Sequence, residues 1–165
     1  MVSLFRTIDT EQNSRRIIMK IDLCTIGFSQ KNLRTFVELL ERNHVTKLVD
    51  IRLNNTSQLS GYSKKDDLEY IMELRNIEYV HELLLAPTDD LVKAYRKKEI
   101  SLDTFEKRYL ELLIERDIKE KIDEIIDNKT VCLLCSEHKP HHCHRRVLAE
   151  YIRKYREDVY IIHLM

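Results

Sequence analysis

The stretch Val131-Cys132-Leu133-Leu134-Cys135 contains only apolar side chains, although 34% of the residues in the chain are charged. Alternation of apolar and polar residues would predict a strand with one face in solvent, whereas a continuous apolar run predicts a strand covered on both faces. Such strands are typical of parallel sheets with helices packed on each side. We therefore expect a buried strand over residues 130–135.

Short apolar runs alternate with amphipathic segments along the rest of the chain. The runs predict further strands at residues 21–26, 47–51, 77–81 and 159–164. The amphipathic segments predict a helix capped by Ser29 and helices at residues 66–75, 89–98, 103–116, 117–127 and 144–155. Residues 52–63 are polar and aperiodic, which predicts a loop. This order predicts an α/β fold: a three-layer, Rossmann-like open sheet, mostly parallel, with helices on both faces.

The length of the chain and its scarcity of glycine and proline predict a single domain. A chain of 165 residues is long enough for one ordinary core and short for two. Only 2 glycines and 2 prolines are present, which leaves no flexible or proline-rich linker. Residues 1–20 have no clear period, so we expect an irregular N-terminal lead-in there and one domain over residues 21–165.

The charge pattern limits the classes of partner. The 28 Lys and Arg residues balance the 28 Asp and Glu residues, so the chain has no global basic field that would attract nucleic acid. A local basic patch is still compatible with this balance. No segment resembles a membrane span, and residues 1–20 lack the apolar region of a signal peptide. We therefore expect a cytoplasmic protein with reduced thiols and no membrane partner.

Chemically capable side chains follow four of the predicted strands. In an open parallel sheet, ligands bind beyond the carboxyl ends of the strands. We expect the site at that edge, with these residues, in chain order: Ser29, Asp50, Arg52, His81, Cys135 and Glu137, then Cys143, His144 and Arg145 at the start of a helix.

Several of these groups have two interpretations. Asp50 and Arg52 share one side of an extended segment, either as a functional carboxylate–guanidinium pair or as an ion pair that holds a strand end. His81 is an acid/base candidate or an ordinary strand end. Cys135 ends a strand, where a thiol can be reached, whereas Cys143 begins a helix, whose N-terminus lowers the pKa of a thiol.

The histidines between the two cysteines raise the question of zinc. His138, His141 and His142 could supply ligands together with Cys135 and Cys143, or they could form a solvated polar loop. Their spacing does not match that of a zinc ribbon or zinc finger, so we predict no metal and no cofactor.

Four segments resemble those of the DUF488 family of uncharacterised prokaryotic proteins. The strongest match pairs residues 133–137 with Cys143-His144-Arg145, which is similar to the family's LLC-x-E and CHR motifs. Residues 25–29, 48–52 and 78–81 are similar to its TIGHS, LVDVR and Y-x-H segments. Phe28 stands where the family often has His, and residues 53–58 replace a Pro/Arg-rich stretch. The resemblance covers roughly residues 22–153 and implies a compact Rossmann-like fold without an assigned activity.

These features favour an enzyme that acts on a phosphate-bearing substrate, either a nucleotide or nucleic acid. Cys135 or Cys143 would serve as nucleophile or redox thiol, with His144, Glu137 or Asp50 as acid or base. The anion would be bound by the helix N-terminus together with Ser29, Arg52, His81 and Arg145.

One class of enzyme is disfavoured. A Cys-dependent phosphatase needs a Cys and an Arg separated by five residues, and His141 occupies the position where that Arg would follow Cys135. The alternative class is a non-enzymatic module that binds nucleic acid or a partner protein and could be stabilised by a metal. In that case the Cys143-His144-Arg145 cluster would be structural and would lock the last helix to the sheet.

Overall fold

The strands form one sheet in the computed structural model, which describes residues 20–56 and 58–165. Within these residues five strands pair in the order β3-β2-β4-β1-β5, and every pairing is parallel. The strands are β1 (Ile21–Gly27), β2 (Lys47–Asp50), β3 (Glu78–His81), β4 (Val131–Cys135) and β5 (Val159–Leu164). The predicted α/β open sheet is confirmed. Of the lead-in expected at residues 1–20, residues 1–19 lie outside the described residues.

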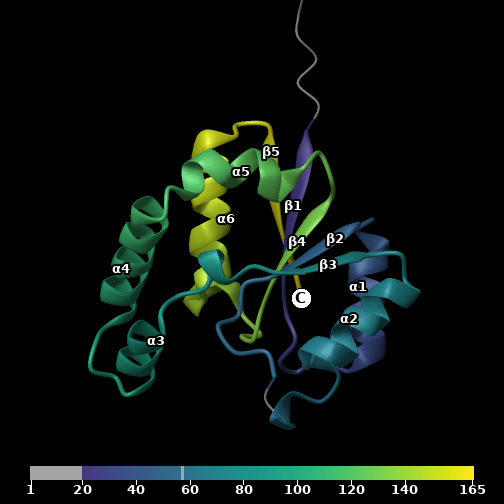
Figure 1. Ribbon diagram of the computed structural model, residues 1–165, viewed down its shortest axis with the longest axis horizontal. Helices are drawn as coiled ribbons and strands as arrows, with labels where there is room; N and C mark the ends of the chain where they lie inside the picture. The colour runs from purple at the N-terminus through teal and green to yellow at the C-terminus, as the bar shows by residue number, and fades with distance from the viewer. Residues whose placement is uncertain (1–19, 57) are drawn as a thin grey trace, which may run out of the picture.

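Helices cover both faces of the sheet (Figure 1). One face carries α1 (Leu33–Arg42) and α2 (Lys65–Leu74), and the other carries α5 (Ile118–Ile126) and α6 (His144–Tyr155). The helices α3 (Asp89–Arg96) and α4 (Leu102–Glu115) lie beyond α6 as an outer pair on that second face. Two apolar cores result, one on each side of the strands.

The central strand β4 explains why the apolar run at residues 131–135 is continuous. All five of its residues are buried, because helices pack on both faces and strands β1 and β2 pair with its two edges. Successive side chains point to opposite faces. Cys132 accordingly packs in the core under α1 and α2, whereas Cys135 packs in the core under α6.

Two local predictions were wrong. Ser29 does not cap α1: the N-cap is Asn32, whose side-chain oxygen accepts a hydrogen bond from the backbone N–H of Thr35. Gln30 adopts a left-handed conformation, and this turn delays the helix by three residues. The segment expected to be a loop at residues 52–63 contains the 3-10 helix η1 (Gln58–Ser63). None of the described helices is both long and apolar enough to cross a membrane.

The topology places the predicted site residues at one edge. β4 lies between β2 and β1, so the carboxyl ends of the three strands are adjacent, as expected from the sequence. The helix that follows β4 packs on the opposite face from the helices that follow β1 and β2. The chain therefore leaves β4 towards one face of the sheet and leaves β1 and β2 towards the other. Open α/β sheets form their ligand crevices at such a point.

Candidate functional site

Two thiols meet where β4 ends and α6 begins. The Sγ atoms of Cys135 and Cys143 lie 2.6 Å apart, and both side chains are buried. The connection between them contains the short 3-10 helix η3 (Pro140–His142), and the N–H of Cys143 donates to the carbonyl of Pro140. This turn carries the chain back onto the end of the strand that it has just left.

Arg145 holds this turn together from inside the molecule. Its guanidinium is completely buried and donates to Sγ of Cys135 at 2.8 Å and to Sγ of Cys143 at 3.5 Å. It also donates to the backbone carbonyls of Glu137 and His138. Nε donates to the hydroxyl of Thr25 on β1. Arg145 therefore links β1, the end of β4 and the start of α6.

Gly27 allows this arrangement, because β1 passes very close to the turn. A Cβ atom at Gly27 would lie 1.7 Å from the carbonyl oxygen of Glu137 and 2.9 Å from Nη1 of Arg145. Both atoms belong to the hydrogen-bonded turn, so neither could move away without breaking it. The glycine that ends the first strand is required by packing rather than by backbone conformation.

The two thiols differ in acidity. Burial raises the pKa of Cys135, but the S–H of Cys143 and the guanidinium of Arg145 stabilise the thiolate and lower that pKa overall. Burial raises the pKa of Cys143, and the neighbouring Cys135 raises it further. When the pair loses one proton, the negative charge therefore lies on Cys135, next to Arg145.

His144 is turned towards the second strand. Because a backbone carbonyl can only accept, Nε2–H of His144 donates to the carbonyl of Ile51 at 3.1 Å. Its ring meets the ring of Tyr109 edge to face at 5.6 Å. Burial lowers the pKa of His144 to about 4, so the imidazole is neutral near pH 7. A neutral imidazole can accept a proton at Nδ1, which lies 4.0 Å from Sγ of Cys143.

This lowered pKa predicts a pH-dependent stability. Between pH 6.5 and about 4 the unfolded chain binds a proton at His144 that the folded protein does not, so stability falls as the pH is lowered through this range. The variant His144→Gln keeps an N–H donor for Ile51 but cannot titrate. We expect urea unfolding to show that this variant loses about 1–2 kcal/mol less stability than the wild type between pH 7 and pH 5. Parallel stability curves would contradict the assignment of a neutral His144 with a lowered pKa.

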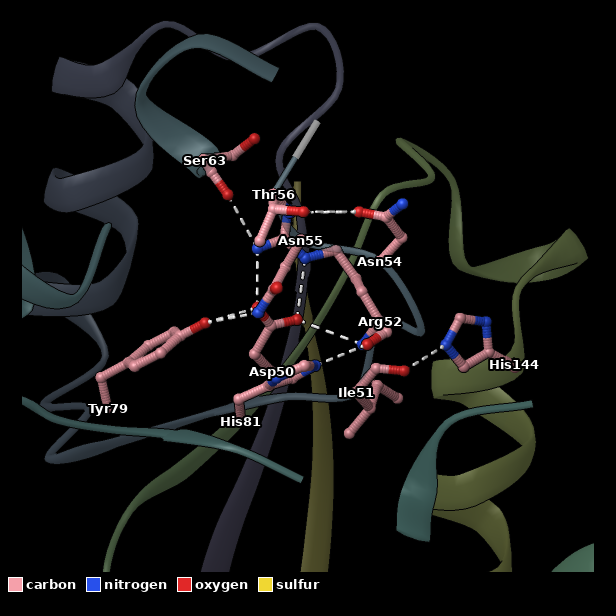
Figure 2. Close-up of polar contacts among 10 residues, drawn as sticks. All are labelled: Asp50, Ile51, Arg52, Asn54, Asn55, Thr56, Ser63, Tyr79, His81 and His144. Atoms are coloured by element: carbon pink, nitrogen blue, oxygen red, sulfur yellow. Dashed lines mark hydrogen bonds and ion pairs between the residues drawn. The ribbon is translucent and has the colours of Figure 1, made fainter. Parts of the chain in front are cut away.

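The second cluster surrounds the carboxylate of Asp50, which is completely buried (Figure 2). Arg52 donates to both carboxylate oxygens, from Nε at 2.8 Å and from Nη2 at 2.7 Å. The hydroxyl of Tyr79 and the side-chain amide of Asn55 donate to the second oxygen at 2.6 and 3.1 Å. Arg52 also donates to the carbonyl of Ser63, which ties η1 to the strand end.

Burial would raise the pKa of Asp50, but the hydrogen bonds and charge of Arg52, with the donors Tyr79 and Asn55, lower it overall. The Asp50 carboxylate is therefore ionised, and its charge is neutralised by Arg52 inside the protein. The two clusters are connected through the backbone between them, because His81 donates to the carbonyl of Arg52 at 2.8 Å and His144 to that of Ile51.

A cleft of about 480 Å³ opens at this edge of the sheet. One wall is formed by the loops that follow β2 and β4, and includes Arg52, Glu137, Cys143 and His144. The other wall is formed by α3, α4 and their connection, and it contributes cations and aromatic rings. That wall includes Asp89, Val92, Tyr95, Arg96, Lys98, Ile100 and Phe105.

Comparison with known families identifies the chain. Residues 32–152 match the profile of the family described as Domain of unknown function DUF488. The chain belongs to the DUF488 family. The match runs from the cap of α1 into the last turn of α6, so it includes Cys135, Cys143, Arg145, the residues around Asp50 and all of α3 and α4, but not β1 with Thr25 and Gly27. No curated protein and no solved structure matches this DUF488 chain.

The structure of this DUF488 protein brings together most of the residues singled out from the sequence. Cys135, Cys143 and Arg145 form one cluster, and Asp50 and Arg52 form the other. Glu137 is exposed and lines the cleft, but its contact with Arg145 is made through the backbone carbonyl. Ser29 contacts the end of β4 through its backbone, donating to the carbonyl of Ser136. Its side chain makes no hydrogen bond to any described residue.

The histidines of the connecting turn separate from one another. Nδ1 of His138 lies 3.2 Å from the carbonyl of Ser29 and 3.4 Å from Nζ of Lys31, whereas His141 and His142 are exposed. Over residues 20–56 and 58–165, no three His, Cys, Asp or Glu side chains gather closely enough to hold a metal ion.

Sequence reasoning missed several members of the site. Tyr79 and Asn55 complete the set of hydrogen-bond donors around the Asp50 carboxylate. In the other cluster, the Thr25 hydroxyl accepts from Arg145 and lies 2.7 Å from Nδ1 of His163. Thr25 could have been found, because it is the polar residue among residues 23–27, which are otherwise apolar. The cleft wall formed by α3 and α4 has no comparable signal in the sequence, because Arg and Lys residues are common on any solvent-exposed helix face.

Proposed function

We propose that the protein is an enzyme that acts on a phosphate-bearing substrate, a nucleotide or nucleic acid, in the cleft at the carboxyl edge of the sheet. The observation that carries the proposal is the combination of a thiol with cations in one cavity. Cys143 and His144 lie on the wall formed by the sheet, and Arg96 and Lys98 lie on the facing wall. The cleft volume of about 480 Å³ is in the range of small-molecule sites.

The charges on the cleft walls favour an anion. Arg52, Arg96 and Lys98 are cationic, whereas Asp89 and Glu137 are the acidic lining residues. Arg52 is largely neutralised by Asp50, so the facing wall supplies the positive charge that is available to a ligand. Tyr95 and Phe105, whose ring centroids are 4.9 Å apart, provide an apolar surface beside it. A ligand with a phosphate and a flat ring matches this surface.

The thiol pair supplies a nucleophile for this substrate. Cys143 lines the cleft, and its proton can pass to Sγ of Cys135 at 2.6 Å as Cys143 attacks an electrophilic centre of the bound substrate. Cys135 would act as the base, and Arg145 would stabilise the charge on the pair throughout. Neutral His144 is placed to accept or return a proton at Nδ1.

Binding of AMP, measured by isothermal titration calorimetry, tests the cationic wall. We expect the double variant Arg96→Gln/Lys98→Gln to bind AMP about 10-fold more weakly or worse, because charge-assisted contacts contribute about 1.5–3 kcal/mol. The matched control is Lys93→Gln/Lys97→Gln, which removes the same charge from the same segment but faces the opposite groove. Equal losses in the two variants would show a general charge effect and contradict a site in this cleft.

A non-enzymatic binding module is the second candidate, and the buried position of Arg145 favours it. That guanidinium donates to protein atoms of β1, of β4 and of the turn that follows β4, as a structural lock requires. Incubation with a panel of nucleotides and short oligonucleotides, followed by mass spectrometry, separates the two. An enzyme requires product formation that Cys143→Ser abolishes while AMP affinity is kept. If the wild type binds these ligands but forms no product, the protein is a binding module rather than an enzyme.

A further inference from the structure

We propose that Cys135 and Cys143 form a reversible redox pair, which a hydroperoxide that enters the cleft converts into an intramolecular disulfide. The sulfur atoms are 2.6 Å apart, so closing the bond length of about 2.05 Å requires a movement of only about 0.5 Å. This inference does not depend on the phosphate-bearing substrate, because it concerns the thiols themselves.

The pair is held in position by rigid elements on both sides. Cys135 is the last residue of the central strand, and Cys143 is the N-cap of α6. The turn between them is fixed by Arg145, which donates to the carbonyls of Glu137 and His138. The two sulfurs therefore face each other without any ordering of a loop, so disulfide formation has little conformational entropy to overcome.

The charge distribution activates this pair and leaves the other two cysteines inert. A thiolate is the reactive form of cysteine, and Arg145 lies against both sulfurs, where it stabilises one negative charge. Cys24 and Cys132 are paired in register on β1 and β4 but pack in the opposite core. Burial raises the pKa values of both Cys24 and Cys132.

Access to the pair comes from the cleft. Cys143 is among the residues that line it, between His142 and His144, whereas Cys135 is completely buried and does not line it. A small oxidant in the cleft therefore meets Cys143 first, and Cys135 is placed as the resolving thiol. The sulfenic acid formed on Cys143 would then react at once with the thiol of Cys135.

The chemistry balances as follows. In the singly deprotonated pair, Cys143 transfers its proton to the Cys135 thiolate and attacks one oxygen of the hydroperoxide ROOH, so that an S–O bond forms and the O–O bond breaks. The departing RO⁻ takes up that proton from Cys135 and leaves as ROH, and Cys143 becomes a sulfenic acid. The Cys135 thiolate then attacks the Cys143 sulfur, so that the S–S bond forms and the S–O bond breaks, and the departing hydroxide takes up a proton from solvent to give water. Overall, one thiol, one thiolate, one ROOH and one proton give one disulfide, one ROH and one water.

Hydrogen peroxide, added in small excess to the reduced full-length protein, tests the proposal. We expect the loss of two of the four thiols per chain, a mass decrease of two hydrogen atoms, and a Cys135–Cys143 cross-link in a peptide map made without reductant. Dithiothreitol should restore all four thiols. Oxidation confined to Cys24 and Cys132, retention of four thiols, or irreversible addition of oxygen to Cys143 would each overturn the proposal.

Two serine variants separate the roles of the cysteines. Cys135→Ser should react at Cys143 more slowly than the wild type, because the base is lost, and should stop at the sulfenic acid, which dimedone traps, because no resolving thiol remains. Cys143→Ser should react at least about 10-fold more slowly than the wild type, because Cys135 lies behind the cleft wall. Equal rates in Cys143→Ser and the wild type would overturn the order of attack. The thiol count needs no phosphate ligand, so failure here and failure of AMP binding are distinguishable.

Discussion

Replacement of Arg145 with alanine is expected to lower the free energy of unfolding by about 3–5 kcal/mol, because it removes one partner from a buried, charged network. The substitution leaves the carbonyls of Glu137 and His138 and the hydroxyl of Thr25 without this donor. It also removes the cation that donates to both sulfurs of the Cys135–Cys143 pair. For a chain of 165 residues we expect a Tm about 10 °C lower.

Arg146→Ala provides the matched control in the next position of the same helix. Arg146 forms ion pairs with Glu106 and Glu150 and is partly exposed, at 24%, and pairs with access to solvent contribute about 1 kcal/mol or less. Differential scanning calorimetry of both variants therefore separates a buried lock from a generic loss of charge. The sequence alone predicts an anion-binding role for Arg145. If Arg145→Ala keeps its Tm within a few degrees of the wild type but no longer binds AMP, the structural account is contradicted and that role is supported.

Much of the fold could be predicted from the sequence, because a buried parallel sheet leaves a strong signature. The apolar run at residues 131–135 requires cover on both faces, and that requirement alone indicates helices on each side. The polar residues that follow β1, β2 and β4 led us to expect their carboxyl ends at one edge, and the three strands are adjacent. The predicted start of the first helix was wrong. Ser29 and Asn32 are both favourable N-cap residues, and only the local turn at Gln30 selects Asn32.

The candidate site could be predicted only in part, because its clusters depend on pairs that are distant in sequence. The Asp50–Arg52 contact is local and follows from a spacing of two in an extended segment. The bond from Tyr79 to Asp50 spans 29 residues, and the bond from Thr25 to His163 spans 138. No local pattern encodes those pairings. The close approach of Gly27 to Glu137 likewise appears only when β1 and the end of β4 are placed side by side.

Asp50→Asn is expected to destabilise the protein by about 3–5 kcal/mol, because it leaves the buried charge of Arg52 without a counterion. An asparagine has one acceptor oxygen where the carboxylate has two, and its amide would face the donors of Arg52, Tyr79 and Asn55 (Figure 2). Urea unfolding at pH 7 measures this loss. A matched control with the same chemical change is Asp127→Asn, since Asp127 pairs with Lys129 at the exposed surface; we expect no measurable change there.

The pH dependence of the Asp50→Asn variant provides an independent check. The folded pKa of Asp50 is lower than its unfolded value, so its contribution to stability is fully present above about pH 4 and is lost as the pH falls through the folded pKa. The wild type should therefore lose its advantage over the variant progressively below pH 4. If the difference between the two proteins stays constant down to pH 2, the destabilisation comes from packing, and Asp50 is not the counterion of Arg52. If Asp50→Asn instead unfolds like the wild type at pH 7 but weakens AMP binding, the carboxylate serves the cleft rather than the strand end.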